Sequence, residues 1–135
     1  MFGVPLHLLL VHFPIAFALL AVTYDLRAHF GHAPELHETG YRLTGWASVA
    51  AACAVLSGLQ MGKGRLESSE SIAHVGSALL GVLCLVALMV LRYSAKARQE
   101  EGQDSYSMTW LFLGLLAGLA IAMAAITGHR FALGN

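Results

Sequence analysis

Residues 5–15 read Pro5-Leu6-His7-Leu8-Leu9-Leu10-Val11-His12-Phe13-Pro14-Ile15, an apolar run that contains two histidines and two prolines. The run continues to about Leu26 and so has roughly the 20 residues that cross a bilayer as a helix. No Lys or Arg precedes it, as a signal peptide would require, so we expect a retained helix. Pro14 removes the hydrogen bond to the carbonyl of Leu10, which predicts a bend. Ionisable groups at membrane depth are costly, so the two imidazoles mark a candidate functional site.

The composition favours a membrane protein. The 135 residues are 57% hydrophobic and 12% charged, with a mean hydropathy of +0.66, whereas a soluble domain is about 25% charged. The formal net charge is zero and no basic stripe is present, so nucleic-acid binding is not expected. Cys53 and Cys84 lie inside apolar runs without a Cys-x-x-Cys motif, so we expect no redox dithiol.

Four apolar segments predict an all-α fold, a four-transmembrane-helix up-down-up-down bundle in a single domain over residues 1–135. The spans are expected at about residues 5–26, 41–61, 71–91 and 108–128, with polar loops at 27–42 and 93–107. The segments are apolar all round, whereas the helices of a soluble bundle carry a polar stripe. Small residues every four positions in the last span predict close packing, either inside the bundle or in a homo-oligomer or larger complex.

Alternating helix directions bring four histidines to one end of the bundle: His7, His12, His74 and His129. Three basic residues are expected at the same end, namely Lys63, Arg65 and Arg130. The loop end carries five Lys and Arg, so the positive-inside rule predicts that the loops are cytoplasmic. The termini and the histidines would then be periplasmic, in a multi-pass protein of a bacterial inner membrane.

Histidines that face one another from different helices suit an axially ligated haem iron, and neutral imidazole also suits copper and zinc. We expect His12 and His74 to be the preferred axial pair, with His7 and His129 as a rival pair or a second site. Lys63, Arg65 and Arg130 are candidate partners of the haem propionates. The alternative is a non-haem copper or zinc protein, or a structural subunit of a larger membrane complex.

The segment HLLLVHFPIAFALLAVTYDL, residues 7–26, resembles the N-terminal signature of a bacterial membrane family catalogued as domain of unknown function 2231. The similarity is most specific over Val11–Ala16, and it extends to His74 and to Thr127-Gly128-His129. The resemblance implies four spans and a b-type haem protein, because members resemble or neighbour periplasmic cytochrome-type modules.

Together these patterns predict a small membrane cytochrome with one or two b-type haems. It would transfer electrons near the periplasmic face, between a quinol pool or redox partner and a periplasmic acceptor such as a cytochrome. Two histidine ligands leave no open position on the iron, so an electron carrier is expected rather than an enzyme with its own substrate. A transporter is not favoured, because the acidic residue nearest a span, Asp25, lies at its boundary.

Overall fold

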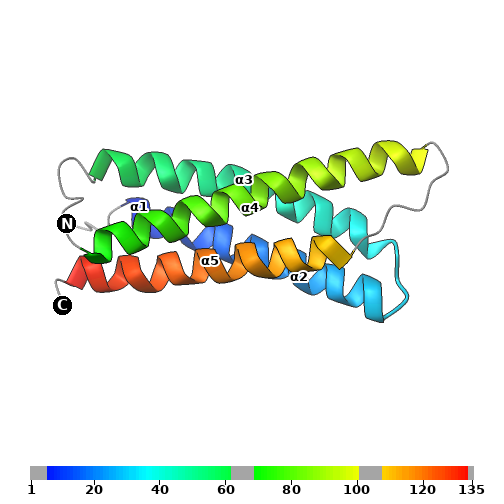
Figure 1. Ribbon diagram of the computed structural model, residues 1–135, viewed down its shortest axis with the longest axis horizontal. Helices are drawn as coiled ribbons and strands as arrows, with labels where there is room; N and C mark the ends of the chain where they lie inside the picture. The colour runs from blue at the N-terminus through cyan, green and yellow to red at the C-terminus, as the bar shows by residue number, and fades with distance from the viewer. Residues whose placement is uncertain (1–5, 62–68, 101–107, 134–135) are drawn as a thin grey trace.

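The structure, a computed structural model, describes residues 6–61, 69–100 and 108–133. Its elements are α1 (Leu6–Leu10), α2 (His12–Phe30), α3 (Leu36–Met61), α4 (Ser69–Glu100) and α5 (Met108–Leu133). Four stretches are long and apolar enough to cross a membrane: Leu6–Phe30, Leu36–Gln60, Ser71–Arg98 and Met108–His129. The predicted all-α bundle of four spans is therefore confirmed, with neighbouring spans running in opposite directions (Figure 1).

The first span is broken near its start, as Pro14 predicts. Helix α1 ends at Leu10, and α2 begins at His12 after a single residue, Val11, whose φ of −67° and ψ of −20° remain helical. The Val11 N–H still donates to the His7 carbonyl at 3.0 Å, so the chain bends without leaving the helical path. This bend separates the short segment that carries His7 from the long segment that follows.

The helices are longer than the apolar runs predicted. Much of 27–42 and the stretch 93–100 are helical, so the expected loop bounds were wrong there. Their Glu, Lys, Arg and Ala residues are good helix formers, and the hydrogen bond from Arg42 Nε to Glu38 Oε1 (3.1 Å) is a stabilising i,i+4 pair. The consequence is that residues expected at the membrane boundary lie inside helices.

The bundle consists of two helical hairpins, because the most extensive packing joins α4 to α5 and α2 to α3. Small residues allow the close approach: Ala47 and Ala117 are fully buried, and Gly81 would place a Cβ 2.7 Å from Ile121 of α5. Large apolar side chains such as Leu59, Val90 and Leu119 point outward and are 62–65% exposed. An outward apolar surface of this kind fits a lipid environment.

Candidate functional site

His7, on α1, contacts α3 through a hydrogen bond and a close packing contact. Its Nδ1 lies 2.8 Å from Ser57 Oγ, and the Ser57 hydroxyl hydrogen is already donated to the Ala54 carbonyl at 2.8 Å. The serine oxygen therefore accepts from the Nδ1–H of His7, which places the free lone pair of the neutral ring on Nε2. Gly58 lies under the ring, and a Cβ there would be 3.1 Å from Cε1 of His7.

His74, on α4, is held in the same way by α5. Its Nδ1 donates to the Ala124 carbonyl at 2.7 Å, because a carbonyl can only accept. Gly128 lies under this ring, and a Cβ there would be 2.7 Å from Cε1 and 2.8 Å from Nδ1. The neutral His74 ring therefore also carries its lone pair on Nε2. The hydrogen bonds of these two rings, to Ser57 and to the Ala124 carbonyl, both use Nδ1.

The two imidazoles meet between the hairpins. Their ring centroids are 6.3 Å apart and their planes are 88° to one another. Two imidazoles that bind one metal ion through Nε2 at about 2.0–2.1 Å would have centroids roughly 6 Å apart. A metal-binding histidine usually donates its other ring N–H to a carbonyl or a similar acceptor, as both rings do here. The donor pair therefore fits a metal that needs two imidazoles.

The number of ligands distinguishes between metal types. Among residues 6–61, 69–100 and 108–133, no three His, Cys, Asp or Glu side chains gather closely enough to hold an ion. Structural zinc sites use four protein ligands and catalytic ones use three. Haem iron needs only one or two from the protein, because the porphyrin supplies the others. Two imidazoles are as many protein ligands as a haem iron takes, so the donor set of His7 and His74 is compatible with haem.

The other candidate residues lie differently. His12 is exposed, and its Nδ1 bonds to the Leu8 carbonyl of its own span at 2.6 Å, while His129 is exposed near the end of α5. Lys63 and Arg65 lie outside the described residues, and the side chain of Arg130 is not described. The expected pairings of His12 with His74 and of His7 with His129 stay predictions, and so do the propionate contacts.

The opposite end of the bundle contains a charged group that the sequence did not lead us to expect. Asp25 of α2 and Arg92 of α4 form an ion pair through Oδ2 and Nη2, with side chains only 2% and 1% exposed. His37 lies 3.3 Å from the other oxygen of Asp25. The Trp110 ring packs against both groups, with its centroid 5.4 Å from Arg92 Cζ and 5.9 Å from the His37 centroid.

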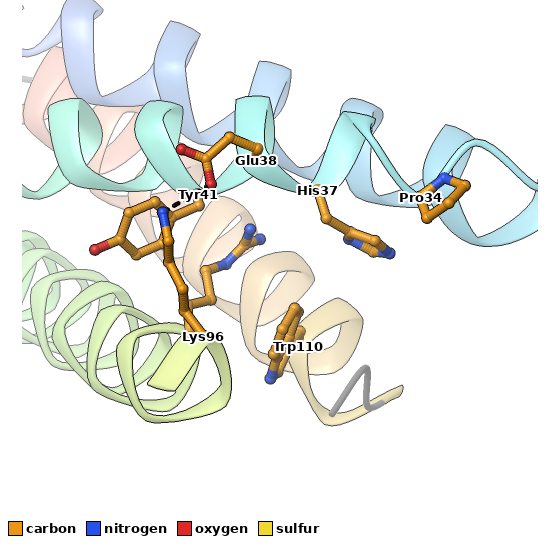
Figure 2. Close-up of a pocket in the computed structure, with 7 residues that line it drawn as sticks. Pro34, His37, Glu38, Tyr41, Lys96 and Trp110 are labelled. Carbon is orange, nitrogen blue, oxygen red and sulfur yellow. Dashed lines mark hydrogen bonds and ion pairs between the residues drawn. The ribbon is translucent and has the colours of Figure 1, made fainter. Parts of the chain in front are cut away.

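A cavity of about 250 Å³ opens beside Arg92, lined also by His37, Glu38, Tyr41, Lys96 and Trp110. Figure 2 shows Lys96 reaching from α4 toward Glu38 on α3, and their Nζ and Oε2 atoms are 3.2 Å apart. The Lys96 ammonium also lies 5.3 Å from the centroid of the Tyr41 ring. Cationic and aromatic side chains therefore form much of the wall.

One sequence signal could have revealed this charged group. Asp25 and Arg92 each lie at the end of an apolar run at the same predicted end of the bundle, and their charges are opposite. The predicted spans end at about residues 26 and 91, next to these two residues, but the helices continue to Phe30 and Glu100, which places the pair inside the packing. Gly40 of α3 makes room for it, because a Cβ there would lie 2.6 Å from Asp25 Oδ1.

These features define a class of protein, a four-helix membrane bundle with two interhelical imidazoles at one end and a buried ion pair at the other. The chain belongs to the family described as predicted membrane protein (DUF2231), whose sequence model matches residues 3–134. The resemblance noted in the sequence is therefore confirmed. Comparison with curated proteins and with solved structures found no match.

Proposed function

We propose that this protein is a membrane b-type haem protein that transfers electrons, with His7 and His74 as the axial ligands. The observation that carries the proposal is the pair of imidazoles whose ring centroids lie 6.3 Å apart, each held through Nδ1 by a neighbouring helix. A haem with two histidine ligands supplies reversible one-electron transfer. Because both ligand positions are then filled, an electron carrier is favoured over an enzyme.

The chain's own residues orient the ligands. Ser57 and the Ala124 carbonyl hold the two rings in place through Nδ1 and so fix the tautomer and the direction of each ring. Gly58 and Gly128 let each ring lie against the neighbouring helix. Lys63, Arg65 and Arg130 are the proposed partners of the propionates, and the positive-inside rule favours a periplasmic position for this end in a bacterial inner membrane. A quinol and a periplasmic redox protein are the proposed electron partners.

The visible spectrum of the full chain tests the proposal. The protein is expressed with haem available, purified in a neutral detergent, and scanned with and without dithionite. We expect split α and β bands on reduction and a stoichiometric pyridine haemochrome. A colourless protein, whether free of metal or holding stoichiometric zinc or copper, would overturn the haem proposal and leave the metal-binding or structural alternative.

Single substitutions then assign the ligands. His7→Ala and His74→Ala should each abolish the spectrum of the low-spin haem, whereas His12→Ala and His129→Ala serve as controls and should retain it. Loss in His12→Ala with retention in His7→Ala would instead support the pair that the sequence favoured. Circular dichroism and gel filtration of each variant show whether the bundle remains folded.

A further inference from the structure

Arg92 is buried, yet two of its nitrogens lack acceptors. Its side chain is 1% exposed, and Nη2 is paired with Asp25. Within the described part of the chain, Nε and Nη1 have no hydrogen-bond partner. Buried polar groups in native proteins are almost always bonded to protein, water or an ion, so a charged donor in this position indicates a missing acceptor. The side chain lines the 250 Å³ cavity, where such an acceptor has room.

The cavity is suited to an anion. Two cationic side chains, Arg92 and Lys96, line it together with one carboxylate, Glu38. Glu38 is shared between Arg42 and Lys96, and Asp25 is not among the side chains that line the cavity. The surrounding charge therefore has an excess of one positive unit. The volume is far above the roughly 10–15 Å³ that one water needs.

The position of the cavity indicates where the anion comes from. It lies at the end of the bundle where α2 joins α3 and where α4 ends (Figure 1). The candidate spans Leu36–Gln60 and Ser71–Arg98 begin and end there, so we expect lipid headgroups nearby. Arginine binds phosphate oxygens with several N–H donors at once, and Lys96 adds a second cation at the half-exposed rim. We propose that this cavity binds a phosphate oxyanion, supplied by a phospholipid headgroup or by free phosphate.

The test uses a tryptophan on the cavity wall. The chain has two tryptophans, and Trp46 is 63% exposed, so Trp46→Phe leaves Trp110 as the single reporter. The full chain in lipid-depleted neutral detergent is titrated with inorganic phosphate and, separately, with dihexanoyl-phosphatidylglycerol below its micelle concentration. Binding is measured by Trp110 emission and, for phosphate, by equilibrium dialysis with radiolabel. Both measurements are repeated at fixed ionic strength with chloride as the competing anion.

Variants that remove charged side chains test whether the anion binds at this cavity. The double variant Asp25→Asn with Arg92→Gln removes the cation without leaving a buried unpaired charge, and it should weaken binding at least tenfold. Lys96→Gln should weaken it less. The matched control is Arg98→Gln, an exposed cation near the end of the same helix, which should leave binding unchanged.

Each result has a definite consequence. Saturation by the lipid at lower concentration than by phosphate assigns the site to a headgroup, and equal or tighter phosphate binding assigns it to the free ion. The proposal is overturned if neither probe saturates in dialysis or emission, if chloride competes equally, or if the double variant binds as tightly as the parent. These outcomes are independent of haem binding, which concerns the other end of the bundle.

Discussion

Substitution of Gly40 by alanine should destabilise the buried charge pair. The new Cβ would lie 2.6 Å from Asp25 Oδ1 and 3.1 Å from Arg92 Nη1. The aspartate side chain is short and 2% exposed, so it cannot move aside and keep its partner. Breaking a buried ion pair costs about 3–5 kcal/mol, and alanine recovers about 1 kcal/mol of helix propensity relative to glycine. The expected net loss in the free energy of unfolding is about 2–4 kcal/mol.

The measurement is reversible unfolding of the purified chain in mixed micelles, with dodecyl sulfate as the denaturant and helix content as the signal. Gly45→Ala is the matched control on the same helix. A Cβ at Gly45 would lie 3.8 Å from Met89 Cε, which is an ordinary contact. That variant should be unchanged or more stable by up to about 1 kcal/mol, because only helix propensity changes.

A thermodynamic cycle separates the charge pair from general crowding. In the Asp25→Ala, Arg92→Leu background there is no ion pair to displace, so Gly40→Ala should lose its cost. A penalty of the same size in that background would refute the reasoning. So would a loss below about 1 kcal/mol in the parent chain, since a broken buried pair costs more than that.

The remaining predictions concern the histidine end and the lipid-facing surface. Gly128→Ala should displace the His74 imidazole that packs against it and lower haem occupancy in a reconstitution titration, whereas Gly118→Ala, with nothing within 4 Å, should not. Ser57→Ala removes an acceptor next to a ligand and should weaken haem binding about 10–100-fold. Ser48→Ala, which loses only a bond to its own helix, should leave the affinity unchanged. Leu119→Lys places a charge on an outward position that is 65% exposed and should raise the cost of membrane insertion by about 2.5–3.5 kcal/mol in a glycosylation-mapping assay; no change would contradict a lipid-facing position.

The sequence was sufficient for the number of spans, their directions and the bend near Pro14. These depend on the length of apolar runs and on the missing N–H of proline, which are local properties. The ends of the helices were less predictable. Hydropathy detects where apolar residues stop, whereas a helix continues for as long as polar helix formers such as those in 93–100 follow.

The sequence pattern could not predict how each helix is rotated about its own axis. His7 and His12 are five residues apart, about 140° around an ideal helix, so they cannot both face the same neighbour. The span is apolar on every side, and its periodicity therefore does not say which histidine faces inward. In the structure His7 lies against α3, where it contacts Ser57 and Gly58, about 50 positions along the chain.

Each of the two polar features brings side chains of both hairpins together, and we infer that both contribute to assembly. The histidine pair takes one ring from α1 and one from α4, and each ring bonds a residue 50 positions later in its own half of the chain. The ion pair likewise joins α2 to α4 at the other end. Apolar helices in lipid gain little from burying more apolar surface, so packing and polar bonds decide how they pair. A metal held by both rings would bind only when the two hairpins are assembled. Its binding should therefore stabilise the association of the hairpins, by the free energy of that binding, more than it stabilises either hairpin alone.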